Sequence, residues 1–255
     1  MILAAGRGER MRPLTDHTPK PLLQVGGKPL MQWPLEALGR GGFNQVVVNT
    51  AWLGDQISQT FGHDFILQPA SNRPHTLSKQ ERMTINYSHE GLDFGGALET
   101  AGGIVRALPR LGEVFWVLAG DVFAPDFMFS PDAVRRFAAS GKLAHIWLVP
   151  NPAHNLKGDF GMAPDGLALN QAEVKYTYST IGLYRSALFA PPFCGIPKGN
   201  PDGIKAPLAP LLRAAMAQGL VSAEMYTGDW TDVGTPERLQ FLNQNRALRQ
   251  AQPHP

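Results

Sequence analysis

The chain has 255 residues, of which 44% are hydrophobic and 17% are charged, and its formal net charge is +2. These values exclude a disordered chain, suit one large globular domain, and give no support for binding to nucleic acid or to an acidic membrane surface. No apolar run is long enough to span a bilayer. The single cysteine, Cys194, excludes an internal disulfide bond and favours a reducing compartment, so we expect a cytoplasmic protein.

Apolar runs and helical patterns alternate along the chain. After an apolar run that ends at Leu3, the pattern predicts strands over residues 45–49, 83–89, 114–118, 144–149, 176–184 and 222–226. It predicts helices over residues 30–38, 55–61, 100–108, 131–140, 206–218 and 236–249. This alternation is typical of an α/β protein, so we expect one domain over residues 1–250, a mixed and mainly parallel sheet with helices on both faces, and a frayed tail over residues 251–255.

Prolines and glycines mark the interruptions in this pattern. Pro29 suits the first residue of a helix, whereas Pro34 removes an interior hydrogen-bond donor and predicts a kink or a late start. Residues 160–169, with a Pro-Asp-Gly turn at their centre, predict a hairpin. Residues 63–82 and 190–204 lack periodicity, so we expect a surface loop and an irregular segment there.

The first twenty-two residues contain a loop suited to an anion. Gly6 and Gly8 follow the first apolar run, and the cations Arg7, Arg10 and Lys20 come after it, with Lys20 between two prolines. Backbone N–H groups in such a loop can surround an anion while fixed cations approach from one side. The third glycine of a dinucleotide fingerprint and the Gly-Lys-Ser/Thr of a Walker loop are both absent, which disfavours a nicotinamide dehydrogenase. The first strand has almost no residues before it, which leaves open a start upstream of Met1.

The run Leu-Ala-Ala-Gly-x-Gly-x-Arg-Met-x-Pro-Leu-Thr, followed by Pro-Lys-Pro-Leu, resembles the signature of sugar-1-phosphate nucleotidyltransferases. Supporting segments extend the resemblance to about residue 240, and they are most similar to the branch of the family that transfers a uridylyl group to N-acetylmuramate α-1-phosphate in peptidoglycan recycling. These segments are 49–54, 90–91, 98–104, 158–160, 205–213 and 230–235. The resemblance implies a Rossmann-like nucleotidyltransferase fold, a nucleoside triphosphate and a sugar 1-phosphate as substrates, Mg²⁺ as cofactor and pyrophosphate as product.

The resemblance also implies roles for residues on the nucleotide side. Arg10 and Lys20 would stabilise charge on the reacting phosphates, as nucleotidyl transfer requires fixed positive charge more than covalent help. The phosphates and the nucleoside would contact Leu3, Ala4, Ala5, Gly6, Gly8, Glu90, Leu98, Thr100, Ala101 and Gly102.

Two aspartates are predicted to hold the magnesium ion. Asp121 follows the apolar run 114–118, and Asp232 lies in Trp-Thr-Asp-Val-Gly at the end of another expected strand, so both would lie at strand ends, where open α/β sheets present ligands. Two carboxylates, with phosphate oxygens and water, suit Mg²⁺. The family carries its metal on aspartates that match these two. Relatives often have Asn where this chain has Ala119. That Asn would contact the sugar phosphate, and Ala119 lacks the polar group for this contact.

The resemblance further implies that the sugar phosphate contacts Gly161, Glu173 and Lys205. Thr180 stands where the family usually has glycine, and it adds bulk near the expected sugar pocket. Two alternatives remain open. One is guanylyl or thymidylyl transfer to a hexose 1-phosphate, and the other is a non-catalytic sensor of nucleotide sugars, which would not need to retain both metal-binding aspartates.

Overall fold

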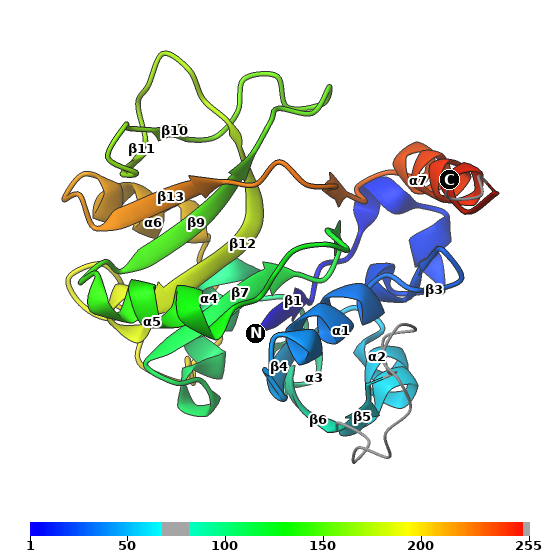
Figure 1. Ribbon diagram of the computed structural model, residues 1–255. Coiled ribbons are helices and arrows are strands. Elements are labelled where there is room, and N and C mark those ends of the chain that lie inside the picture. Colours follow the sequence, from blue (N-terminus) through cyan, green and yellow to red (C-terminus); the bar gives the residue numbers. More distant parts are fainter. Residues whose placement is uncertain (68–81, 252–255) are drawn as a thin grey trace, which may run out of the picture.

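The computed structural model describes residues 1–67 and 82–251; the rest of the predicted loop (68–81) and the tail residues 252–255 lie outside the described residues. One eight-stranded sheet has the order β13-β9-β12-β7-β1-β4-β6-β5 (Figure 1). Strand β12 runs antiparallel to both of its neighbours and β5 runs antiparallel to β6, whereas all other pairs are parallel. The predicted mixed, mainly parallel sheet is therefore confirmed. The strands of this sheet are β1 (Ile2–Ala4), β4 (Gln45–Thr50), β5 (Asp64–Ile66), β6 (Arg82–His89), β7 (Val114–Ala119), β9 (Ala144–Val149), β12 (Thr177–Arg185) and β13 (Val221–Met225).

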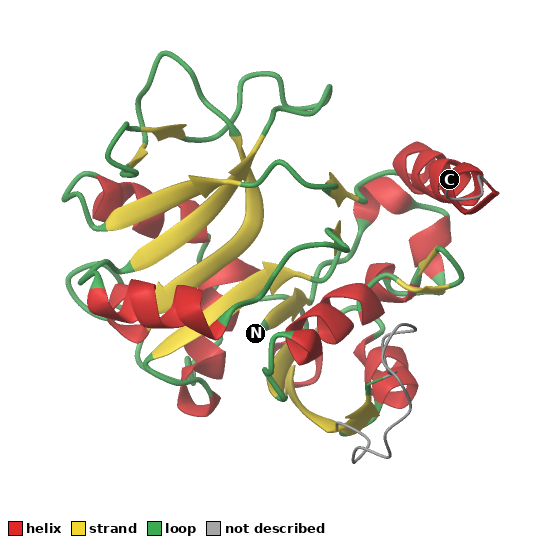
Figure 2. Cartoon of the chain, in the orientation of Figure 1, coloured by secondary structure: helices red, strands yellow, loops and turns green. Residues whose placement is uncertain are grey.

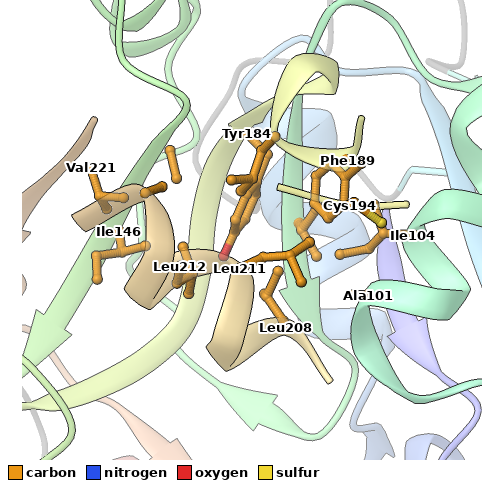
Figure 3. Packing of buried hydrophobic residues seen from close by; sticks show 14 of the residues in the cluster. Ala101, Ile104, Ile146, Tyr184, Phe189, Cys194, Leu208, Leu211, Leu212 and Val221 are labelled. Atoms are coloured by element: carbon orange, nitrogen blue, oxygen red, sulfur yellow. The ribbon is translucent and has the colours of Figure 1, made fainter. Parts of the chain in front are cut away.

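Helices cover both faces of the sheet, because successive side chains of the buried strands point to opposite sides. In β7, Phe115 and Val117 join a core cluster with α4 (Glu99–Ala107) and α6 (Leu208–Met216). Trp116 and Leu118 join the opposite cluster with α1 (Gln32–Arg40), α2 (Gly54–Phe61) and α5 (Pro131–Ala139). Figure 2 shows these helices in red around the yellow strands, and Figure 3 shows Leu211 and Leu212 of α6 near Tyr184 of β12, with Ile104 of α4 beside Cys194.

The remaining elements are short, apart from the last helix, α7 (Pro236–Ala251). Helix α7 includes Ala251, the first residue of the segment expected to be a tail. The short elements are α3 (Glu90–Phe94), η1 (Glu9–Met11), η2 (Leu14–Asp16), η3 (Lys20–Leu22), η4 (Leu108–Arg110), η5 (Ser186–Phe189), β8 (Val122–Phe123), β10 (Gly161–Met162), β11 (Ala168–Leu169) and β14 (Thr231–Asp232). No helix of the described residues combines the length and the apolar character that a membrane span requires.

The prediction that Pro29 begins a helix is wrong. Pro29 lies in β3 (Lys28–Pro29), which pairs with β2 (Gln24–Val25) in a tight hairpin. Gly26 and Gly27, the two central residues of the turn, have φ values of 59° and 82°. A two-residue hairpin turn of type I′ requires a positive φ at both of these positions. Helix α1 starts later, so that Pro34 lies in its first turn, where no intrahelical donor is needed; the predicted late start is confirmed.

Two other local predictions have different outcomes. The segment predicted as a loop from residue 63 contains β5, whose three residues pair with β6 at the sheet edge. The hairpin predicted over residues 160–169 is confirmed, since β10 pairs antiparallel with β11.

A third, smaller core joins the two ends of the chain. Helix α7 packs through Leu239 and Leu242 against buried residues of the N-terminal segment and of the β8–β14 pair. This core contains Met11, Leu23, Val25, Leu30, Phe123 and Val233. In Figure 1, the red α7 therefore lies beside the blue N-terminal segment.

Candidate active site

A cavity of about 680 Å³ opens at the carboxyl ends of β1 and β7. Its other walls come from the start of α4, the first part of β12 and the start of α6. Because β12 is antiparallel to β7, its beginning lies at the same edge of the sheet as the end of β7. The residues that line the cavity are Leu3, Ala4, Ala5, Gly6, Gly8, Glu9, Arg10, Met11, Lys20, Pro21, Asn49, Ala97, Glu99, Thr100, Val117, Ala119, Asp121, Phe160, Tyr178, Thr180, Pro207, Leu208, Ala209, Leu212 and Gly234.

The glycine loop forms one end of this cavity, and glycine is needed at its two positions, Gly6 and Gly8, for different reasons. A Cβ atom at Gly6 would meet no described atom within 4 Å, so this position leaves space on the cavity side of the loop. Gly8 has a φ of 70°, and a Cβ atom there would lie 3.0 Å from Cγ2 of Thr15. The hydroxyl of Thr15 donates to the carbonyl of Gly8 at 2.8 Å. Gly8 thus folds the loop back, while Gly6 keeps it open.

Arg7 fixes the loop from behind. Its guanidinium lies 3.5 Å from the ring centroid of Trp52, and both side chains donate hydrogen bonds of 2.9 Å to the carbonyl of Thr15. A cation held over an aromatic face in this way contributes roughly 0.5–2 kcal/mol. Arg7 therefore has a structural role, in contrast to Arg10, which is exposed and lines the cavity.

Lys20 and Asp121 form an ion pair at the wall of the cavity. Lys20 is placed by η3 between Pro19 and Pro21, and its side chain is 12% exposed. Asp121 follows the end of β7, as predicted. The structure therefore brings together the predicted cation and one of the two predicted metal ligands, although they are 101 residues apart.

Asp232, the second predicted metal ligand, is not among the described residues that line the cavity. Arg238 of α7 donates to its Oδ2 at 2.6 Å, and Nε2 of His154 lies 2.9 Å from its Oδ1. The N–H of Val233 donates to the carbonyl of Asp121 at 2.9 Å, so the backbones that carry the two aspartates are adjacent.

The two predicted aspartates supply carboxylate oxygens, which a hard divalent cation prefers as ligands. Oδ1 of Asp232 is buried and accepts no hydrogen bond from the described residues, although Nε2 of His154 lies 2.9 Å from it. The described residues contain no cluster of three or more His, Cys, Asp or Glu side chains that could hold a metal ion. Phosphate oxygens and water would therefore have to complete the coordination, as they usually do for Mg²⁺.

The residues predicted to recognise the base are divided between wall and interior. Thr100 lines the cavity, as does Glu99, whose φ of 58° is unusual for a residue other than glycine. Leu98 and Ala101 are fully buried, and Ala101 and Gly102 donate their N–H groups to the carbonyl of Ala206 at 2.9 and 3.1 Å. The last two residues therefore anchor the start of α4 rather than face the cavity.

Glu90 is buried with 0% exposure beneath this turn. Its Oε1 accepts from Nδ2 of Asn49 at 2.7 Å and its Oε2 accepts from the N–H of Leu98 at 2.8 Å. Burial raises the pKa of the Glu90 carboxyl, and these two hydrogen bonds and the charge of Arg106 oppose that rise. Both carboxylate oxygens thus have partners within the protein.

The opposite end of the cavity is largely apolar. Phe160, Leu208 and Leu212 line it together with Tyr178 and Thr180. The hydroxyls of Tyr178 and Tyr184 lie 2.6 Å apart, and burial raises the pKa of both, so both remain protonated at neutral pH. Such a wall suits a sugar that carries apolar substituents better than it suits a phosphate.

The three residues predicted to contact the sugar phosphate are absent from the described lining. Gly161 lies in the β10–β11 hairpin, where a Cβ atom would come within 2.2 Å of Ala172. Glu173 and Lys205 are exposed. The structure does not bring these three together with Lys20 and Asp121.

Sequence reasoning missed several lining residues. Asn49 carried a signal, because it is a polar residue at the end of a predicted buried strand. Tyr178 and Leu212 carried none, since their place in the cavity depends on the antiparallel insertion of β12 and on the packing of α6.

Residues 1–174 match the model of the nucleotidyl transferase family. The chain therefore belongs to this family of enzymes, and the resemblance to sugar-1-phosphate nucleotidyltransferases is confirmed by its relatives.

An N-acetylmuramate alpha-1-phosphate uridylyltransferase from Neisseria meningitidis is 44% identical over 250 residues, which cover 94% of each chain. A protein of the same name from Caulobacter vibrioides is 28% identical and covers 93% of this chain and 92% of the relative. A crystal structure of a putative glucose-1-phosphate thymidylyltransferase from Bacillus anthracis matches with a TM-score of 0.70 and 21% identity, over 100% of this chain and 96% of the other. This last similarity confirms the fold.

Proposed function

We propose that this protein transfers a uridylyl group from UTP to N-acetylmuramate α-1-phosphate in the cytoplasm, with UDP-N-acetylmuramate and pyrophosphate as products, and so serves peptidoglycan recycling. The 44% identity to the Neisseria uridylyltransferase, over nearly the full length of both chains, supports this choice of substrates. The observation that carries the proposal is the cavity itself, in which a glycine loop with Arg10, Lys20 and Asp121 lies at one end and an apolar wall at the other.

The chemistry needs no nucleophile from the protein. An oxygen of the sugar phosphate attacks the α-phosphorus of UTP, and a new P–O bond forms. The bond from this phosphorus to the oxygen that bridges to the β-phosphate breaks, and its electron pair leaves with pyrophosphate. Lys20 and Arg10 stabilise the negative charge that moves during transfer, while the loop at Gly6 admits the phosphates close to its backbone.

Asp121 and Asp232 would hold Mg²⁺, which would supply further charge neutralisation when bound. Lys20 is paired with Oδ2 of Asp121 in the structure, so the other carboxylate oxygen would serve the cation unless the ammonium moves away. Lys20 lies at the same wall and would offer its ammonium to a phosphate.

The test is a panel of UTP, GTP and dTTP against N-acetylmuramate, mannose and glucose 1-phosphates, with pyrophosphate release as the readout. We expect the highest kcat/KM for UTP with N-acetylmuramate α-1-phosphate, loss of release with EDTA, and recovery with excess Mg²⁺. A higher kcat/KM for GTP with mannose 1-phosphate would identify a guanylyltransferase instead. That outcome has some support, since a mannose-1-phosphate guanylyltransferase catalytic subunit beta from Drosophila pseudoobscura is 28% identical over 93% of this chain and 59% of the relative. Nucleotide binding without pyrophosphate release from any pair would identify a sensor.

A further inference from the structure

Two walls of the cavity that are far apart in the sequence are joined by a buried chain of hydrogen bonds. The N–H of Ala4, the last residue of β1 before the glycine loop (the phosphate loop, residues 5–10), donates to Oδ1 of Asn49 at 2.9 Å. Nδ2 of Asn49 donates to Oε1 of Glu90 at 2.7 Å, and the N–H of Leu98, just before α4, donates to Oε2 at 2.8 Å. These hydrogen bonds therefore connect the end of β1, through the end of β4 and the start of α3, to the start of α4.

The donors and acceptors in this chain admit one arrangement. Ala4 can offer an N–H group and nothing else, so the Asn49 amide must present its oxygen there and its NH₂ group to Glu90. Leu98 likewise offers an N–H group to Glu90. The side chain at position 90 must therefore accept two hydrogen bonds on two different atoms, which a carboxylate does and an amide cannot.

Gly103 of α4 makes room for this pair. A Cβ atom at Gly103 would lie 2.5 Å from Oε1 of Glu90 and 2.9 Å from Nδ2 of Asn49. Glycine in the middle of a helix is unfavourable by roughly 1 kcal/mol relative to alanine, so its presence at this crossing indicates that the close approach of α4 matters.

Glu90 itself has 0% exposure and is absent from the described lining of the cavity, whereas Thr100 and Ala4 line it. Its carboxylate thus has no described path to a bound base or phosphate. Any influence on the nucleotide has to pass through the groups that Glu90 holds.

We propose that Glu90 is a positioning residue: through Asn49 and Leu98 it fixes the phosphate loop relative to the start of α4, and thereby sets the affinity for the nucleotide. This inference rests on the proposed function, since it assumes that a nucleoside triphosphate occupies this end of the cavity.

The first measurement is the Kd for UTP by calorimetry with Mg²⁺ and without sugar phosphate. In Glu90→Gln, an NH₂ group replaces one acceptor and faces a donor, so we expect the Kd for UTP to rise about tenfold. The KM for the sugar 1-phosphate should change less than about threefold, because Tyr178 and Leu212 are not part of this chain of hydrogen bonds. Ser88→Ala is the matched control, since Ser88 is the buried neighbour of Asn49 in the sheet and its hydroxyl has no hydrogen-bond partner among the described residues. Its Kd for UTP should equal that of the wild type.

The decisive measurement is a double-mutant cycle with Asn49→Asp. In Asn49→Asp alone, two carboxylates face each other. In Asn49→Asp/Glu90→Gln, the carboxylate introduced at position 49 can accept from both Ala4 and the new amide, and the amide oxygen can accept from Leu98, so all three hydrogen bonds return with the same net charge. Asn49 lines the cavity, so its replacement can itself change UTP binding. This direct effect is the same in Asn49→Asp and in Asn49→Asp/Glu90→Gln, so it cancels when these two variants are compared. We therefore expect Glu90→Gln to weaken UTP binding in the wild-type background and to strengthen it about tenfold in the Asn49→Asp background.

Two outcomes would overturn the proposal. One is an effect of Glu90→Gln on UTP binding with the same sign in both backgrounds. The other is a reversal of sign in the melting temperature without one in the Kd for UTP, which would make the role purely structural. Failure of the proposed function is distinguishable, because a wild-type protein that binds UTP but releases no pyrophosphate leaves the binding cycle measurable.

Discussion

The two ends of the cavity are built in different ways. The phosphate end is formed mostly by a contiguous segment, in which Gly6, Gly8, Arg10 and Lys20 lie within fifteen residues of one another. The acceptor end is assembled from β12, α6 and Phe160, which meet through the packing of the sheet. Recognition of a phosphate needs backbone N–H groups and cations in a fixed local geometry, which a short motif can encode. Recognition of a sugar with apolar groups needs a shape, which packing between distant elements provides.

The largest expected effect is at the phosphate end. Lys20→Ala and Asp121→Ala should each lower kcat about 100-fold or more, because the first removes a cation from the reacting phosphates and the second removes a carboxylate proposed to hold Mg²⁺. Circular dichroism should show an intact fold. Lys142→Ala is the matched control, since its ammonium donates to the carbonyl of Gly219 at 2.6 Å, and neither residue is among those described as lining the cavity. Pyrophosphate release at the wild-type rate in either site variant would contradict the assignment.

The two glycines of the loop should respond differently to alanine. Gly8→Ala places a Cβ atom in a left-handed conformation and against Thr15, which should lower the free energy of unfolding by about 1–2 kcal/mol. Gly6→Ala should leave the melting temperature nearly unchanged, since its Cβ atom would meet no atom of the described residues within 4 Å, yet raise the Kd for UTP severalfold by filling space that the phosphates need. Unaltered UTP binding by Gly6→Ala would show that the phosphates lie elsewhere.

At the acceptor end, Tyr178→Phe leaves the buried hydroxyl of Tyr184 without its partner. We expect a loss of about 1–3 kcal/mol in the free energy of unfolding. The KM for the sugar 1-phosphate should rise a fewfold while the Kd for UTP stays constant, which separates the two ends of the cavity. Steady-state kinetics and calorimetry provide both values. An equal change in both constants would mean that the ends are not independent.

The smallest effect is expected for Thr180→Gly. Thr180 has a φ of 63°, which is strained for a β-branched residue, and its buried hydroxyl has no hydrogen-bond partner among the described residues. Relief of this strain opposes the greater chain entropy of glycine in the unfolded state, so the free energy of unfolding should rise by no more than about 1 kcal/mol. The wider cavity should also raise kcat/KM for acceptors other than the best one. A narrower acceptor range in the panel would contradict this role of Thr180.

The sequence was informative wherever a local pattern determines the structure. The strand that ends before Asp121 and the glycine loop were predicted from short runs of residues, and the sheet and cavity contain both. Pro29 was misplaced because two consecutive glycines with positive φ outweigh the preference of proline for a helix start.

The remaining differences depend on tertiary packing. The burial of Glu90 follows from the approach of α4 at Gly103, and no local pattern shows that approach. The positions of Glu173 and Lys205 outside the described cavity follow from the paths of two connecting segments, which periodicity does not determine. Their proposed contacts with the sugar phosphate stay predictions.

The packing of α7 against the N-terminal segment has a consequence for how the protein is made. Asn243 accepts from the N–H of Gly26 at 2.9 Å and donates to the carbonyl of Gln24 at 3.0 Å, and Leu239 and Leu242 complete the small core that contains Met11. The segment that carries Lys20 is therefore synthesised before the helix that packs against it. A nascent chain that stops before residue 236 would contain every residue of the glycine loop without this neighbouring helix, so catalytic competence should appear only after α7 has emerged from the ribosome.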